Sequence, residues 1–395
     1  MSAVVNNNEA PKEPGMNKVL LIVAMLLMCF GVAVVYTASI PRAVANGFAA
    51  EHYLLGHLAK VSLGLVLMLF FGRVWDYAHW RVFGRLLFFA SAIATLATLM
   101  TSKVNGANRG IFGLQPSEFL KLGVIIYVSW KLAQAGDNIK TVACSVVQPG
   151  IPFLITVVLL AKQPNYSMMI LISFVLICVM LSAGVNLKYM GIGALAAIPV
   201  VIVLLVRSEH SRARLMSFFG LGGTMEASNW QGEHALQALG NGGFTGTGFG
   251  MGVQKLGYLP EAHKDVVYAV IGEEFGLMGT MLVLILFAVL FAQGFKIAKE
   301  SSTRFGKYLA LGLTLSLFAN FAIHLGVCVG LLPMTGQPLP FFSYGGTNLI
   351  YTSIAIGILL NISRPKSGRK IKEPMTSGVS MESSAYRNYD MTRSG

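Results

Sequence analysis

The stretch GYLPEAHKDVVYAVIGEEFG, residues 257–276, gathers acidic side chains, a histidine and a lysine in a chain where only 12% of the 395 residues are charged. An apolar segment follows it directly and extends the hydrophobic run to about residue 294. A helix of about 20 apolar residues is long enough to cross a bilayer. We therefore predict that residues 266–294 span a membrane and that the charged stretch lies at the mouth of this helix.

Comparable apolar runs recur along the chain, which is 54% hydrophobic and has a mean hydropathy of +0.65. Soluble domains carry about twice this share of charged residues. The predicted fold class is therefore an all-α polytopic membrane protein with about ten transmembrane helices and a large outer loop between helices seven and eight. The predicted spans are 17–39, 53–71, 82–101, 117–134, 147–162, 167–184, 188–206, 266–294, 307–332 and 344–362. A tail at 1–16 precedes this transmembrane domain of residues 17–364. A polar, Ser-rich tail at 365–395, which we expect to be disordered, follows it.

The formal net charge of +13 has a simple explanation in a membrane protein. Lys and Arg gather in the C-terminal tail and in the short loops on the side of the termini, and cytoplasmic loops show this excess. We predict that both termini are cytoplasmic and that nucleic acid is not a partner. The loop at about 207–265, between spans seven and eight, then faces outward. A loop of this length usually has a function.

The charged stretch itself contains candidates for chemistry. Pro260 suits the first turn of a helix, so Glu261 and Asp265 are expected on one helical face, with Asp265 at the outer membrane surface. Glu273 and Glu274 would lie two to three turns deeper, where ionisable residues are costly and usually functional. The alternative is a plain helix start whose acidic residues favour the helix dipole. That alternative accounts for Glu261, but it accounts poorly for Glu273 and Glu274.

The stretch KVNGANRGIFGLQPSEFLKLG, residues 103–123, forms a second polar group. Arg109 is expected outside the membrane. Glu118 and Lys121 lie three residues apart in span four and share a helical face. An ion pair inside a membrane can serve a substrate or can serve packing alone, and the sequence leaves both interpretations open.

Three further stretches belong to the same outer side. KQPNYS at 162–167 is a polar turn, and GLLPMTGQPLPFFSYGGTN at 330–348 carries three prolines and no charge. Irregular backbone at membrane depth is tolerated only where protein buries it or a cavity adjoins it, so we predict a re-entrant segment there. GNGGFTGTGFGMG at 240–252 can cradle an anion with its backbone N–H groups or form flexible turns. Together these stretches predict a polar cavity open to the outer leaflet, suited to an amphiphilic substrate with an anionic head group.

Four of these stretches resemble the signature stretches of the SEDS family (shape, elongation, division and sporulation proteins). They are YLPEAHKDVVYAVIGEEFGLMG, GANR…QPSEFLKLG, QPNYS and GLLPMTGQPLPFFSYGGTN. The resemblance extends from Lys18 to about Arg364. It implies a ten-span peptidoglycan glycosyltransferase of the cytoplasmic (inner) membrane that polymerises lipid II on the outer face of that membrane, beside a class B penicillin-binding protein. YLPEAH and VVYTAS, residues 34–39, are more similar to the cell-division branch than to the elongation branch, which implies a septal location and divisome partners.

The resemblance also implies roles for single residues. The essential aspartate of the family falls on Asp265, which would act as the general base. Charged residues and a histidine of the outer side would bind the substrate. Four cations would lie on its pyrophosphate, namely Arg109, Arg212, Arg214 and Lys255, and the other substrate-binding residues would be Glu118, Lys121, Glu261 and His263. A divalent cation, Mg²⁺ or Mn²⁺, could assist, although no ligand spacing in the sequence indicates one.

The sequence departs from the family pattern at three positions. Asn165 stands where the family usually has an aspartate, Gly110 where it has a tryptophan, and His324 where an asparagine is common. None of these positions lies in the PEAHKD motif, so activity is still expected.

Two other functions remain open at this stage. A lipid II flippase would have the same spans but a path open to both faces of the membrane. A non-catalytic scaffold would only recruit the penicillin-binding protein, and the changes at Asn165 and Gly110 would suit it.

Overall fold

The computed structural model describes residues 15–100, 110, 113–191, 193, 209–219, 227–259 and 261–364, and every structural statement below concerns these residues. The predictions for the two tails, for Arg109 and for most of the span at 188–206 lie outside this part of the chain.

Helices joined by turns make up the described residues, so the all-α prediction is confirmed. In this part of the chain nine helices coincide with predicted spans: α1 (Lys18–Ala45), α2 (His52–Arg73), α3 (Trp80–Ala97), α4 (Pro116–Ala135), α5 (Gln148–Lys162), α6 (Tyr166–Ala183), α10 (Val267–Glu300), α11 (Arg304–Cys328) and α12 (Gly346–Ile362). Helices α1, α2, α3, α6, α10 and α11 belong to segments long and apolar enough to cross a membrane, whereas α5 and α12 are apolar but shorter. Helix α4 carries Glu118 and Lys121 in its first two turns.

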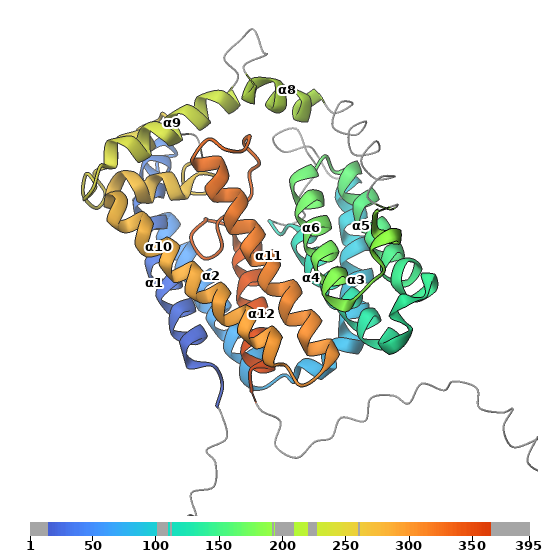
Figure 1. The fold of residues 1–395 in the computed structure, drawn as a ribbon. Coiled ribbons are helices and arrows are strands. Elements are labelled where there is room, and N and C mark those ends of the chain that lie inside the picture. Colours follow the sequence, from blue (N-terminus) through green and yellow to red (C-terminus); the bar gives the residue numbers. More distant parts are fainter. Residues whose placement is uncertain are drawn as a thin grey trace, which may run out of the picture. The chain divides into compact units, whose positions relative to one another are not determined.

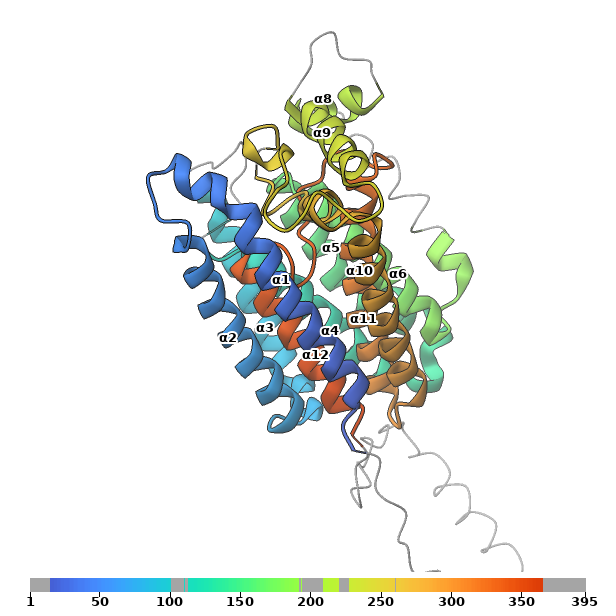
Figure 2. The same ribbon diagram turned by 90° about the vertical axis from the view of Figure 1, so that its left-hand side faces the viewer.

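Packing pairs α2 with α12, α3 with α4, and α10 with both α11 and α1 (Figure 1). Figure 2 shows α1, α2 and α12 running side by side. The backbone N–H of Asn17, the cap of α1, donates to Ser363 Oγ beyond α12 at 3.1 Å, and the Asn17 amide donates to Gln293 Oε1 of α10 at 2.9 Å. The start of α1 and the ends of α10 and α12 therefore lie together. We call this the terminal end of the helices and the opposite end, where α10 begins, the loop end.

Two helices, α8 (Glu209–Phe218) and α9 (Ala227–Gly242), lie at the loop end, in the segment that the sequence analysis treated as a glycine-rich loop (Figure 1). Helix α9 packs against α10. Its residues 235–239 are Ala, Leu and Gln, which favour helix, and the dense glycine run begins only at Gly240. The outer loop is therefore partly helical.

The start of α10 corrects the prediction that a helix begins at Pro260. Residues 261–265 form turns, and the helix begins at Val267. Glu261 has φ +54°, a left-handed backbone that interrupts any right-handed helix. The N–H of Asp265 still donates to the Glu261 carbonyl at 3.1 Å, but the two side chains do not share a helical face. Contacts with distant segments, described below, hold this turn.

The segment between α11 and α12 is non-helical and mostly buried at 334–343. Phe341, with φ +68°, brings its carbonyl against Gly31 in the middle of α1. A Cβ on residue 31 would lie 3.1 Å from the Phe341 carbonyl carbon and closer still to its oxygen, so only glycine admits this approach. Irregular backbone enclosed by protein at mid-helix depth is the arrangement that the prolines of this stretch predicted. We call residues 330–345 the re-entrant segment.

Candidate active site at the loop end of the helices

Asp265 is half-buried where the turn 261–265 meets the re-entrant segment. Its carboxylate lies beside Gly336, since a Cβ on that glycine would be 3.7 Å from Asp265 Oδ2. Arg214 of α8 interacts with it electrostatically: burial lowers the pKa of Arg214, and the charge of Asp265 opposes that shift. Three segments distant in sequence thus meet at this carboxylate.

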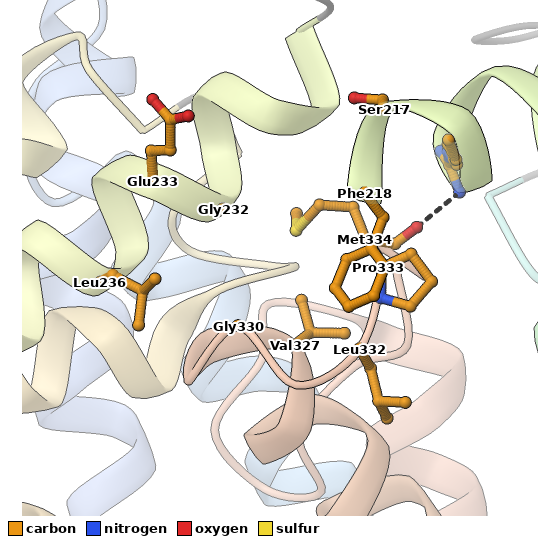
Figure 3. A pocket seen from close by; sticks show the side chains of 11 residues that line it. Ser217, Phe218, Gly232, Glu233, Leu236, Val327, Gly330, Leu332, Pro333 and Met334 are labelled. Carbon is orange, nitrogen blue, oxygen red and sulfur yellow. Dashed lines mark hydrogen bonds between the residues drawn. The ribbon is translucent and has the colours of Figure 1, made fainter. Parts of the chain in front are cut away.

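A cavity of about 330 Å³ lies beside Arg214. Residues of α8, α9, the end of α11 and the re-entrant segment line it (Figure 3): Arg214, Ser217, Phe218, Gly232, Glu233, Leu236, Val327, Gly330, Leu332, Pro333 and Met334. The Arg214 guanidinium donates to the Met334 carbonyl at 3.2 Å, the bond dashed in Figure 3. Ligand pockets begin at about this volume. Because Arg214 both lines the cavity and interacts with Asp265, it connects the cavity to the carboxylate.

Glu261 joins α1 to the turn. Its carboxylate pairs with Arg42 of α1 and with Lys264, whose Nζ lies 2.7 Å from Oε2, and it lies 3.9 Å from His263 Nε2. The expectation that Glu261 sits on the first turn of a helix is wrong, because no helix starts there. Its charge instead ties the turn to a neighbouring helix.

His263 and Lys264 are both affected by burial. The pKa of His263 is lowered to about 3 by burial and then by the positive charges of Lys264 and Arg42, which outweigh the nearby Glu261. The imidazole is therefore neutral at physiological pH. Burial and Arg42 also lower the pKa of Lys264, while Asp265 partly raises it.

The glycine-rich segment 240–252 lies directly on α10, which Gly276 interrupts with φ +63° and ψ −158°. A Cβ on Gly276 would lie 2.6 Å from the Phe244 carbonyl oxygen, so a side chain is excluded there. The N–H of Leu277, freed from the helix by this break, donates to the Gly243 carbonyl at 3.0 Å. The break in α10 thus supplies the backbone groups that bind the segment.

Glu273 and Glu274 complete this attachment. Both are fully buried or nearly so, at 0% and 1% exposed. The Glu273 carboxylate accepts the N–H groups of Val253 at 2.9 Å and Gln254 at 3.1 Å, and Glu274 accepts that of Gly250 at 3.1 Å. The two glutamates that the sequence placed deep in a span are therefore acceptors for the glycine-rich segment.

Lys255 belongs to the same attachment. Its side chain is buried, its ammonium pairs with Glu274, and it donates to the Gly250 carbonyl at 2.9 Å. The family resemblance implied that Lys255 binds the pyrophosphate of the substrate. The structure places its charge in a buried ion pair instead.

Glu118 and Lys121 form an ion pair of 2.7 Å near the start of α4, at 1% and 0% exposed. The Lys121 ammonium also lies 3.8 Å from the centroid of the Tyr351 ring in α12, and the Tyr351 hydroxyl bonds Ser316 of α11. This burial fits the packing interpretation, because the pair joins α4, α11 and α12.

The remaining predicted residues are spread over the loop end. Arg212 is exposed on α8. Asn165, one of the departures from the family pattern, is buried at the start of α6, and its amide nitrogen has no hydrogen-bond partner within the described residues.

His324, noted in the sequence only as a departure, has a positional role. Its Nε2 accepts the N–H of Tyr268 at 3.4 Å, so Nδ1 carries the proton and donates to the Gln337 carbonyl at 2.9 Å. His324 of α11 thus joins the first turn of α10 to the re-entrant segment. In the sequence, two signals marked His324: its place in an apolar segment and its departure from the family's asparagine.

The described residues offer few side chains that could bind a metal ion together. No group of three or more His, Cys, Asp or Glu side chains that could hold an ion occurs among residues 15–364 as far as they are described. Mg²⁺ is often held by one or two carboxylates together with substrate phosphates, an arrangement that Asp265 alone could begin.

The family described as Cell cycle protein, FtsW/RodA/SpoVE, matches residues 17–368. A relative from Trichlorobacter lovleyi, named probable peptidoglycan glycosyltransferase FtsW, is 35% identical over 352 residues, 87% of this chain and 92% of the relative. One of the same name from Bacillus subtilis is 31% identical over 377 residues, 90% of this chain and 93% of the relative.

Two solved structures share the fold. A chain from "Structural coordination of polymerization and crosslinking by a peptidoglycan synthase complex" has a TM-score of 0.71 and 23% identity, and the match covers 88% of this chain and 97% of that one. The rod shape determining protein RodA of Thermus thermophilus has a TM-score of 0.64 and 22% identity, with 88% and 96% covered. With the family match over most of the chain and relatives above 30% identity, the chain belongs to the SEDS (FtsW/RodA/SpoVE) family of cell cycle proteins.

Proposed function

We propose that this protein is a peptidoglycan glycosyltransferase that polymerises lipid II into glycan strands on the outer face of the cytoplasmic membrane. The curated relatives, which the match covers over 92% and 93% of their length, are named probable peptidoglycan glycosyltransferases. The observation that carries the proposal is the position of Asp265. This half-buried carboxylate lies at the junction of three segments, beside Arg214 and the cavity that Arg214 lines.

The reaction joins two lipid II molecules. A sugar hydroxyl of one attacks the anomeric carbon of the other, the bond to the lipid pyrophosphate breaks, and the configuration inverts. Asp265 accepts the proton of the attacking hydroxyl, a role that typically contributes about 10²–10⁴-fold. Positive charge stabilises the departing pyrophosphate, and Arg214, with the exposed Arg212 on the same helix, is the candidate for it.

The roles of the other charged residues follow from their contacts. Lys255 and Glu274 support the glycine-rich segment, and Glu118 with Lys121 supports the packing of α4. Asp265 is the carboxylate of this site that would hold Mg²⁺ or Mn²⁺, and such a cation would supply positive charge for the leaving group.

The partners and the cellular location of the enzyme are proposed from the same family. A class B penicillin-binding protein and divisome proteins are the partners, and the septum is the site of action. Both termini are proposed to be cytoplasmic, and the bond between Asn17 and Ser363, which puts the start of α1 and the end of α12 on one side, supports a common side for them. Single cysteines at 212 and 236 should react with an impermeant thiol reagent in intact cells. Labelling only after lysis would reverse this topology.

The decisive experiment is polymerisation of fluorescent lipid II by the purified protein with its penicillin-binding partner, with glycan strands resolved on gels. Asp265→Asn keeps the size of the side chain but removes its basicity, so the rate should fall at least ~10²-fold. Lipid II binding should fall much less than the rate, since Arg214 and Arg212 are the side chains proposed to hold the pyrophosphate. Asp137→Asn, at an exposed aspartate paired with Arg304, is the matched control and should be unchanged.

The same experiment separates the alternatives. A flippase would move lipid II across vesicle membranes without forming strands, and a scaffold would do neither. Near-normal strand formation by a well-folded Asp265→Asn variant would remove Asp265 from the mechanism.

A further inference from the structure

The turn that carries Asp265 is held by the end of the re-entrant segment. The backbone N–H of Tyr344 donates to the His263 carbonyl at 2.8 Å, and Ser343 Oγ donates to the Lys264 carbonyl at 2.6 Å. Ser343 Oγ is itself oriented by the N–H of Leu339, at 2.8 Å. These two bonds hold the two peptide groups that come directly before Asp265.

The Tyr344 ring is held in turn by α2. The ammonium of Lys60 lies over the ring, 3.8 Å from its centroid, which is well within the range of a cation–π interaction. The rings of Tyr53 and His57 pack against it from the same helix, with centroids 5.5 and 5.9 Å away. The ring of His263 lies 5.6 Å away on the side of the turn. Tyr344 therefore connects α2 to the turn.

Lys60 is an unusual residue at its position. It lies nine residues into an apolar helix, where a charge costs a few kcal/mol unless it is compensated. None of the ion pairs among the described residues includes Lys60, and the ring face of Tyr344 is the partner that the structure provides. A lysine in this place is explained if its charge serves to hold the ring.

We propose that Lys60 and Tyr344 form a positioning pair for Asp265. Lys60 fixes the Tyr344 ring on α2, the Tyr344 backbone fixes the turn through His263, and the turn sets the position of the carboxylate. Neither side chain touches the substrate. The proposal rests on the proposed function only in taking Asp265 as the reacting group.

The test uses the full-length protein with its penicillin-binding partner and lipid II. Lys60→Met removes the charge and keeps the length of the side chain, and Tyr344→Leu removes the ring. Displacing a reacting group by about 1 Å can cost 10²-fold, so kcat should fall roughly 10- to 100-fold while KM for lipid II changes little. The double variant should be no slower than the slower single variant, because the two side chains act as one unit.

Conservative variants separate positioning from general damage. Tyr344→Phe keeps the ring face and Lys60→Arg keeps the charge, so both should restore most of kcat. Lys131→Met is the matched control: it removes a second lysine that lies over an aromatic ring, 4.7 Å from the centroid of Trp130, but far along the sequence from the turn. It should leave kcat unchanged.

A second readout does not depend on activity. In the wild type the Tyr344 amide should exchange its hydrogen slowly, because it donates to His263. Exchange should become faster in Lys60→Met and return to the wild-type rate in Lys60→Arg. Unchanged exchange together with unchanged kcat in Lys60→Met would overturn the pair, as would a change confined to KM. If Asp265→Asn proves fully active while the exchange pattern holds, Asp265 is not the reacting group, and the pair is a structural link and not a positioning pair.

Discussion

Lys255 offers the sharpest test of how the loop end is built. The sequence suggested that it binds a pyrophosphate, whereas the structure pairs it with Glu274 in a buried site. Lys255→Met removes the ammonium and leaves the Glu274 carboxylate buried with one remaining donor, the N–H of Gly250. Glu274→Gln removes the opposite charge and leaves the ammonium with the Gly250 carbonyl.

The size of the effect follows from the burial of both partners. Breaking a buried ion pair by removing one partner costs roughly 3–5 kcal/mol, because the other charge stays without compensation. Since about 1.4 kcal/mol corresponds to a factor of ten, each single variant should open the glycine-rich segment roughly 10²- to 4 × 10³-fold more often. The Lys255→Met/Glu274→Gln double variant leaves no buried charge at this pair. Its loss of stability should be at least ~2 kcal/mol smaller than the sum of the losses in the two single variants.

Hydrogen exchange followed by mass spectrometry measures this opening. Peptides covering 246–254 contain the amides of Thr247, Gly248, Gly250 and Val253, which donate to Glu273 and Glu274 in the structure. Their protection should fall in both single variants and return in the double variant. Lys296→Met serves as the control, since Lys296 forms an exposed pair of 4.0 Å on the same helix and such pairs contribute little.

One result would refute this reasoning. If Lys255→Met keeps full protection of 246–254 but binds lipid II more weakly, the ammonium faces the substrate and the ion pair with Glu274 does not hold the segment. Glu274→Gln would then leave lipid II binding intact or strengthen it.

Two further predictions concern buried charge. The pKa of His263 is lowered to about 3, so between about pH 6.5 and pH 3 the unfolded chain binds a proton that the folded chain does not. Through this group the free energy of unfolding falls as the pH falls, by up to about 1.4 kcal/mol per pH unit. The melting temperature of His263→Gln should therefore fall less than that of the wild type between pH 7 and pH 5. An equal fall would contradict the lowered pKa of His263. Lys121→Met should destabilise the protein by roughly 3–5 kcal/mol, and Glu118→Gln/Lys121→Met should recover most of it in thermal unfolding. A stable Lys121→Met that no longer binds lipid II would favour a substrate role for the pair.

The sequence by itself determined the class of protein and where its spans lie. Hydrophobic length is a local property, so nine of the predicted spans match helices of the described chain without any knowledge of their neighbours. The three prolines near residue 340 likewise predicted the re-entrant segment, since proline cannot donate a backbone hydrogen bond. The charged stretch at 257–276 indicated where to look for the site, because a membrane makes such a concentration of charge expensive.

Only the tertiary structure decided what each charge does. Glu261 was read as part of a helix, but its pairing with Arg42 and the bond from Tyr344 to His263 hold the chain in a turn there. The sequence could not show that Tyr344 is the partner of Lys60, since the two residues lie far apart along the chain. Local patterns report how apolar a segment is, whereas the partner of a buried charge depends on which distant segments the fold brings within a few ångströms. In this protein the carboxylates of Glu118 and Glu274 form buried ion pairs that hold helices and segments together. Asp265 differs from them because it stays half-buried beside a cavity.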